Sequence, residues 1–403
     1  MAEHFLHGVE VIEMDDGARP IQSVASSVIG LIGTAPQGPV NKPTLILGSR
    51  TEAVKIFGEH KDGFTIPAAL DAIFDQAGAM VVVVNVADPD NEERLDDDGQ
   101  LDGGKITMGD VIGGVNTDGT YRGAECLLAA QTECKVQPRI LVAPGFTHQR
   151  PNGNANPVVS ALLGIAERLR AIAVADCPNE TKEEAVSYRE DFGSPRLYCA
   201  YPWAKVYDVK TDAIREEPLS ARIAGLIAKN DNEKGFWWSP SNLEINGIVG
   251  ISKPVDFTLG DPVCVANFLN ENKVATIIQQ DGFRLWGNRT TAGDAKWCFI
   301  SVRRTADMIN DSLLRAHLWA VDRNITKTYT EDVCEGVNNY LRYLKNIGAI
   351  IGGKCWADGS LNTPDQIQQG KIVFDFDFTP PYPAEHITFR SRLVNDYLTE
   401  IFE

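Results

Sequence analysis

The sequence has no apolar run that could cross a membrane. Its longest apolar stretches, residues 80–86 and 347–351, have only the length of buried strands, whereas a membrane helix needs about 18 or more apolar residues. The first residues also carry charged and polar side chains where a signal peptide would have its apolar segment. We therefore predict neither membrane insertion nor a secretion signal.

Cysteine and histidine are few and scattered. The 8 cysteines include no CxxC pair, and the 6 histidines share no spacing typical of metal ligands. A disulfide framework is not expected in a chain of this size with this spacing. We predict reduced, buried thiols in a protein made in the cytoplasm, and no metal site.

Motifs for nucleotide binding and catalysis are also missing. Gly352-Gly353-Lys354 is followed by Cys355 rather than Ser or Thr, so it is not a P-loop, and neither GxSxG nor HExxH occurs. The glycines at 30–33 do not form GxGxxG, and prolines follow where a phosphate-binding helix would begin. We predict no catalytic residue and no cofactor.

Composition narrows the class of protein. The chain has 403 residues, 43% of them hydrophobic and 23% charged, which is typical of a globular protein with more than one domain. Its formal net charge of −17 argues against nucleic acid as a partner, because nucleic-acid binding depends on positive side chains that neutralise phosphates.

Short apolar runs alternate with amphipathic segments over residues 27–200. This rhythm predicts a layered α/β domain with a largely parallel sheet. A helix start is predicted at Asn156-Pro157. Residues 88–119 interrupt the rhythm because they are rich in Asp, Glu and Gly. We expect a solvated insertion that is either irregular or β-rich, with 106–108 as a candidate strand.

A second region follows the aromatic segment near residue 236. Strands are predicted at 274–278, 283–286 and 297–302, and helices at 306–321 and 331–346. We read this region as a compact α+β unit that is closed by strands near the C-terminus.

Both ends of the chain carry strand patterns with apolar residues at alternate positions. Val9 and Val11 form one near the N-terminus, and Ile387 and Phe389 form one after a proline-rich break at 380–383. Before that break, one face of a strand is formed by Ile372, Phe374, Phe376 and Phe378. Such strands are suited to pairing with another chain.

Five blocks of the sequence resemble contractile tail sheath proteins, most closely those of P2-type myophages and R-type tailocins. These blocks are GVEVIEMDDGARPIQSVASSVIGLIGTAPQGPVNKPTLILGS (8–49), KGFWWSPSNLEINGIVG (234–250), DGFRLWGNRTT (281–291), WCFISVRRTADMI (297–309) and KIVFDFDFTPPYPAEHITF (371–389). They extend over the whole chain.

The resemblance implies a structural subunit, not an enzyme, that polymerises as stacked hexameric rings around an inner tube and contracts to drive the tube through a cell envelope. Its implied partners are other copies of itself, the inner tube protein, and baseplate and tail terminator proteins. It implies assembly in the host cytoplasm and then a place in a virion or tailocin particle.

The resemblance also implies a division of the chain. We expect an N-terminal arm (1–26), an α/β outer domain (27–250), an α+β inner domain facing the tube (251–383) and a C-terminal arm (384–403). Val9, Val11, Ile387 and Phe389 would anchor the arms on a template strand formed by 372–378 in neighbouring subunits. Candidate contacts to the tube are Arg303, Arg304 and Arg315, although a local ion pair is an equal interpretation of the first two.

Two rival interpretations stay open at this point. One is a soluble α/β enzyme of unknown substrate, whose terminal strands complete its own sheet. The other is a related structural subunit, such as a tail terminator or the sheath of an intracellular secretion system.

Overall fold

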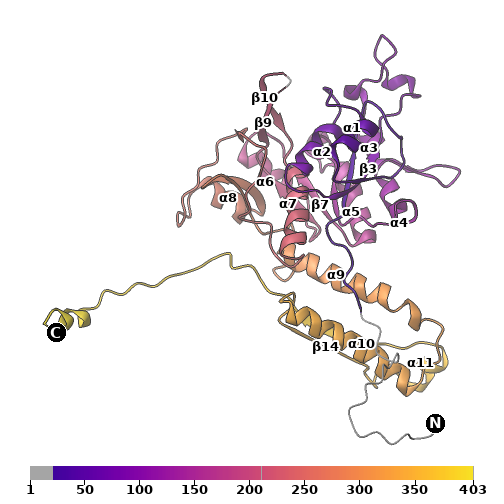
Figure 1. Cartoon of the computed structure of the whole chain (residues 1–403), viewed down its shortest axis with the longest axis vertical. Coiled ribbons are helices and arrows are strands. Elements are labelled where there is room, and N and C mark those ends of the chain that lie inside the picture. Colours follow the sequence, from indigo (N-terminus) through magenta and orange to yellow (C-terminus); the bar gives the residue numbers. More distant parts are fainter. Residues whose placement is uncertain (1–20, 210, 403) are drawn as a thin grey trace, which may run out of the picture.

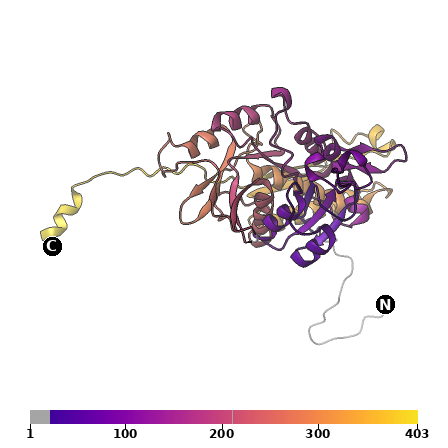
Figure 2. The ribbon, with the colours of Figure 1, turned by 90° about the horizontal axis from the view of Figure 1, so that it is seen from above.

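The computed structural model describes residues 21–209 and 211–402 and has a mixed α/β fold. Figure 1 shows a large α/β body, an elongated helical unit beside it, and a C-terminal segment that extends away from both. The same segment extends away from the body in the perpendicular view (Figure 2). No helix in the described part of the chain combines the length and the apolar character needed to cross a bilayer.

The body is built on an eight-stranded sheet in the order β13-β12-β8-β7-β6-β1-β3-β2. Its six central strands are parallel, and the two edge strands, β2 and β13, are antiparallel to their neighbours. Its strands are β1 (Ile29–Gly33), β2 (Thr44–Leu47), β3 (Met80–Asn85), β6 (Ile140–Val142), β7 (Ile172–Asp176), β8 (Leu197–Ala200), β12 (Val274–Gln279) and β13 (Phe283–Trp286).

Helices cover both faces of this sheet, which explains why its strands are continuous apolar runs rather than alternating ones. In β3, Val82 and Val84 belong to one hydrophobic core, whereas Val81 and Val83 belong to the other. The first core is covered by α3 (Met108–Ile112), α5 (Pro157–Leu169), α6 (Lys182–Glu190) and α8 (Val265–Glu271), and the second by α1 (Arg50–Phe57), α2 (Ile66–Phe74) and α7 (Ser220–Glu233).

The alternation of strands and helices predicted over residues 27–200 is confirmed, as is the helix start at Asn156-Pro157. The Asn156 side chain caps α5 by accepting a hydrogen bond from the backbone N–H of Val159 at 3.0 Å.

The acidic segment at 88–119 is irregular, as predicted, but the strand expected at 106–108 is wrong. Short 3₁₀ turns η1 (Glu92–Arg94) and η2 (Gly103–Lys105) lead instead into α3, which starts at Met108. Ile106 and Val111 are buried in the first core, so part of the segment returns to the body. The hairpin β4 (Gly114–Val115) and β5 (Tyr121–Arg122) ends it, and η3 (Gly123–Ala129) and α4 (Ala130–Glu133) follow.

The predicted domain boundary at 250–251 divides the sheet. Strands β12 and β13 lie after this boundary and nevertheless pair with β8 and with each other. A smaller sheet also spans it, because β11 (Gly250–Ile251) pairs with β9 (Ala204–Asp208), which is joined to β10 (Ala213–Glu217). The body therefore continues through β13.

The strand predicted at 297–302 is wrong, because helix α9 (Ile300–Ala316) begins there. The apolar run in this segment fits a buried strand or a buried helix equally well. The helix places Asp307 and Asp311 on one face, where both pair with arginines of the body.

The C-terminal unit packs α9 against the antiparallel helix α10 (Lys327–Asn346), with the turn η5 (Leu318–Ala320) between them. A separate core joins Met308 and Ile309 of α9 to Leu341 and Leu344 of α10. A two-stranded sheet of β14 (Gly352–Trp356) and β15 (Asp375–Thr379), connected through α11 (Pro364–Gln368), closes the unit.

The first described residues lie on this C-terminal unit. Ile21 and Val24 pack against its core. The hydroxyl groups of Ser23 and Tyr340 are hydrogen-bonded at 3.0 Å, and the backbone N–H of Val24 donates to Ser312 Oγ at 3.1 Å. The chain therefore enters from the C-terminal unit before it forms the body.

Candidate assembly site

The two-stranded sheet of β14 and β15 presents aromatic side chains to the helices. Phe374, Phe376 and Phe378 pack against the core between α9 and α10, whereas Asp377 on the opposite face is exposed. This alternation is the one that the sequence predicts for residues 372–378.

The strand itself is shorter than predicted, because its backbone pairing with β14 starts only at Asp375. The Asn362 side chain binds both backbone groups of Val373, each at 2.8 Å. Residues 372–374 are therefore held by an amide side chain instead of a partner strand, and Ile372 precedes β15.

The two edges of this small sheet differ. Cys355 of β14 lies opposite Phe376, and both backbone groups of Cys355 bind the Asn338 side chain of α10, at 2.8 and 3.0 Å. The outer edge of β14 is thus closed at this point. In the described part of the chain no further strand pairs with β15, so its outer edge is the one that another strand could join.

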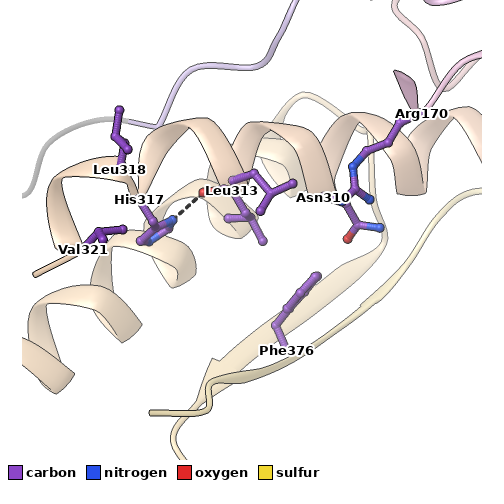
Figure 3. Close-up of a pocket in the computed structure, with 8 residues that line it drawn as sticks. Arg170, Asn310, Leu313, His317, Leu318, Val321 and Phe376 are labelled. Atoms are coloured by element: carbon purple, nitrogen blue, oxygen red, sulfur yellow. Dashed lines mark hydrogen bonds between the residues drawn. The ribbon is translucent and has the colours of Figure 1, made fainter. Parts of the chain in front are cut away.

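An apolar groove of about 460 Å³ lies beside β15. Figure 3 shows Leu313, Leu318 and Val321 from α9 and the residues after it on one side, and Phe376 of β15 on the other. Leu314, Leu318 and Val321 are exposed. His317 also lines the groove, and its Nδ1 lies 2.7 Å from the Leu313 carbonyl oxygen.

The C-terminal segment leaves the unit through a fixed root. Tyr382 contacts the ring of Phe299 edge to face, with centroids 6.1 Å apart. Glu385 accepts hydrogen bonds from Arg289, whose guanidinium also lies 5.6 Å from the centre of the Phe299 ring. The hydrogen bonds to Glu385 raise the pKa of Arg289.

Beyond this root the described residues are exposed up to the final turn η6 (Asp396–Phe402). Ile387 is 66% and Phe389 92% exposed. Apolar side chains at alternate positions that are mostly exposed in their own chain are typical of a segment that binds another molecule. Val9 and Val11, the corresponding candidates near the N-terminus, lie outside the described residues.

The three arginines predicted to contact a tube have different surroundings. Arg304 is buried; its guanidinium pairs with the buried Asp231 of α7 and donates to the Ser26 carbonyl oxygen at 3.2 Å. This burial contradicts the prediction for Arg304, because no part of its charge is presented to a partner. The sequence could not show this, since Asp231 lies in a different helix.

Arg303 and Arg315 both form ion pairs with the aspartate one turn later or earlier in α9. Arg303 donates to Asp307 at 2.7 Å and lies over the ring of Trp297. Arg315 Nε lies 3.0 Å from Asp311 Oδ2 in an ion pair, and the Arg315 side chain is 46% exposed. Arg315 therefore retains the most surface for an outside contact.

The structure also has buried ion pairs that the sequence analysis missed. Arg196, just before β8, donates to Asp307 at 2.5 and 2.9 Å, and Arg139, just before β6, pairs with Asp311. Burial lowers the pKa of Arg196, but the hydrogen bonds and charge of Asp307 outweigh this effect and raise it overall. The only sign of these ion pairs in the sequence is the i,i+4 spacing of Asp307 and Asp311, which places both on one face of a helix.

One buried carboxylate lies at the end of a parallel strand, a common location for active sites. Asp176 ends β7 and accepts hydrogen bonds from the backbone N–H of Ser220 at 2.7 Å and from the Ser220 and Thr147 hydroxyl groups. Burial raises its pKa to about 6. Its oxygens bind the start of α7, so its role here is structural. Among the described residues no three His, Cys, Asp or Glu side chains are grouped to hold a metal ion.

An α/β body, an open β edge and an exposed apolar arm define a protein that is built for self-assembly. Comparison with family models identifies which kind. Residues 26–86 match the tail sheath protein Gp18 domain III N-terminal region, residues 119–291 the phage tail sheath protein central domain, and residues 292–393 the phage tail sheath C-terminal domain.

Relatives and solved structures agree with these matches. The chain is 44% identical to a putative prophage major tail sheath protein of Pseudomonas aeruginosa, with 99% of each chain covered, and 35% identical to the tail sheath protein of Escherichia phage P2, with 98% and 97% covered. Its fold is similar to the anti-feeding prophage helical sheath in the contracted state (TM-score 0.69, 21% identity, 96% and 99% covered).

The chain therefore belongs to the phage tail sheath family. It is a structural subunit of a contractile tail sheath and a component of a tail particle, which confirms the resemblance found in the sequence. The family is structural, so the interpretation as an enzyme of unknown substrate is rejected.

Proposed function

We propose that copies of this chain assemble as stacked hexameric rings around an inner tube, and that contraction of the stack drives the tube through the envelope of a target cell. Relatives with the name tail sheath protein and a shared fold with helical sheaths support this proposal. One structure of similar fold belongs to a baseplate, which supports baseplate association. The tube protein and a tail terminator would be the further partners, with assembly in the host cytoplasm.

The observation that carries the proposal is that one chain has both an exposed arm and an open strand edge. An incoming strand on β15 would satisfy backbone groups that now face outward, and main-chain hydrogen bonds of this kind join extended segments to sheets. Ile387 and Phe389 alternate, so both would point to the same face of the enlarged sheet.

We assign to that face the side of the sheet that carries Phe376, because the groove beside Phe376 is apolar. The arm of a neighbouring copy would therefore bury Ile387 and Phe389 where this chain already places aromatic side chains. Val9 and Val11 have the same alternation, and we assign to them the corresponding role for the N-terminal arm.

The body would form the outer part of the sheath and the C-terminal unit the inner part, beside the tube. Arg315 and Arg303 are the remaining candidates for contact with the tube. Such contacts should be polar and screened by salt, because tight apolar contact would oppose sliding.

The fixed root of the C-terminal arm indicates where the arm would pivot. Tyr382 and Glu385 are both held by contacts to the rest of the chain, so the arm would turn after Glu385 and not in the proline-rich segment before it. Contraction would repack subunit surfaces while the arm pairing persists, and the free energy would come from the change in packing, without nucleotide.

Electron microscopy of negatively stained full-length protein tests this function. The proposal predicts long hollow tubes from the intact chain. Deletion of residues 386–403, or of residues 1–19, should leave a folded monomer that forms no tubes, as judged by circular dichroism and gel filtration. Discrete small oligomers from the intact chain would contradict a sheath, and tubes from both deletions would contradict assembly through the arms.

A further inference from the structure

Two cysteines meet between helix α10 and strand β14. Cys334 packs against the core that contains Cys355, and the two thiols are close enough to interact. Asn338 lies one turn after Cys334 on the same face of α10, and its side chain binds both backbone groups of Cys355. This double hydrogen bond fixes the position of Cys355 relative to the helix that carries Cys334.

The two thiols differ in access to solvent. Cys355 is buried in the core of the C-terminal unit, whereas Cys334 is only partly buried. Both are free in the structure. A reagent in solution can thus reach Cys334 first, and Cys355 is in place to react with the product.

We propose that Cys334 and Cys355 form a reversible disulfide when the assembled particle leaves a reducing cytoplasm and meets an oxidant of the small-molecule disulfide class, such as oxidised glutathione. The cross-linking reaction depends only on this chain. Its consequence for the particle rests on the proposed sheath function.

The reaction balances in two exchange steps. The thiolate of Cys334 attacks one sulfur of the small disulfide, which forms a mixed disulfide and releases one small thiolate. The thiolate of Cys355 then attacks the Cys334 sulfur, forms the protein disulfide and releases the second small thiolate. Two electrons pass from the protein thiols to the oxidant, and the two thiol protons pass to solvent or to the released thiolates.

The surroundings make this reaction slow at neutral pH. Burial raises the pKa of Cys334, and burial together with the neighbouring Cys334 raises the pKa of Cys355 to about 12. Because only the thiolate attacks, the rate should rise about tenfold per pH unit below these values. The pair would stay reduced during assembly and oxidise gradually afterwards.

A second cysteine pair provides an internal control. Cys177 and Cys199 are also in side-chain contact, at the ends of the adjacent strands β7 and β8. Both are completely buried in the core of the body, so a dissolved oxidant cannot reach them in the folded protein. Burial also raises the pKa of Cys177, so access and thiolate fraction should both keep this pair reduced.

The disulfide would attach β14 covalently to α10. Strand β14 is the partner of β15, whose outer edge we propose as the docking position for a neighbouring arm. The cross-link would hold this small sheet on its helix after release of the particle, when no new subunits can replace a damaged one.

Peptide mapping tests the proposal. Full-length protein is purified with a reductant and transferred to oxidised glutathione in two parallel samples, which differ by about two pH units, at about pH 6.5 and about pH 8.5. Both samples are alkylated with N-ethylmaleimide and digested without reduction. We expect a linked peptide containing Cys334 and Cys355, formed about a hundredfold faster at the higher pH, with Cys177 and Cys199 alkylated only after denaturation. C334S and C355S should lose the link, and C134S, at another partly buried cysteine, should keep it.

Two outcomes would overturn the proposal, provided that oxidation of the denatured chain shows the linked peptide to be detectable. In one, Cys334 of the folded protein retains a glutathione adduct and Cys355 stays free. In the other, neither thiol reacts. Oxidised sheaths of the wild-type chain and of C334S are then compared for resistance to unfolding by denaturant. Oxidation should increase the resistance of the wild-type sheath only, and dithiothreitol should remove this increase. Failure of both chains to form tubes would instead contradict the proposed function and leave the mapping result unchanged.

Discussion

Replacing Ile387 and Phe389 together by serine should prevent tube formation without unfolding the chain. The two side chains are 66% and 92% exposed in the isolated subunit, so their loss removes little internal packing. In the proposed assembly both would be buried on a neighbouring copy, next to Phe376.

The expected magnitude follows from these exposed fractions. Burial of a fully exposed Ile or Phe side chain contributes about 1.5–3 kcal/mol, so the two together should contribute about 2.5–5 kcal/mol for each arm. Ordering of the arm offsets part of this gain. A loss of this size would weaken each contact by about two to four orders of magnitude.

The assay is sedimentation of polymer followed by microscopy of the pellet and circular dichroism of the supernatant. The matched control replaces His386 and Thr388 by alanine, because these neighbours alternate with the apolar pair and would face away from the groove. We expect tubes from the control and folded monomer from the serine variant. Tubes of normal length and yield from the serine variant would refute the reasoning.

Two further predictions concern the subunit alone, and the monomeric serine variant is a suitable background for them. Arg304→Ala should lower the free energy of unfolding by about 3–5 kcal/mol, because it leaves the buried Asp231 carboxylate without its partner; Arg342→Ala, at an exposed pair, should change it by less than about 1 kcal/mol in the same denaturant titration. Asp176 has a folded-state pKa of about 6, above its ordinary value of 3.8, so its contribution to stability is complete below pH 3.8 and is lost as the pH rises through 6. Asp176→Asn should therefore flatten the decline in stability between pH 4 and 6, and an unchanged slope would contradict this assignment.

The sequence predicted best those parts of the fold in which local pattern and burial agree. Strands β3 and β7 are apolar runs because helices cover both faces of the sheet, and α5 begins where a capping Asn precedes a Pro. These features depend on neighbours in sequence or on a general rule for parallel sheets.

The predictions failed where distant residues determine the structure. Trp297 and Phe299 favour a strand by composition, yet the helix that begins at Ile300 is the form that aligns Asp307 and Asp311 with arginines of the body. The sequence likewise placed β12 in a separate domain, although its partner β8 lies more than seventy positions earlier.

The candidate assembly site was predicted in outline only. The alternation at Phe374, Phe376 and Phe378 indicated a strand with one apolar face, and Ile387 and Phe389 indicated a second strand. The closure of one edge by Asn338, and the anchoring of the arm root at Glu385, depend on three-dimensional contacts that leave no periodic signal.

The ion pairs along α9 have a mechanical consequence. If α9 slid along its axis or rotated, its buried aspartates would lose their arginine partners where water cannot replace them, which is costly. The C-terminal unit and the α/β body should consequently move as one rigid body. A force applied to the strand edge would then reach the far side of the subunit with little lost to internal bending.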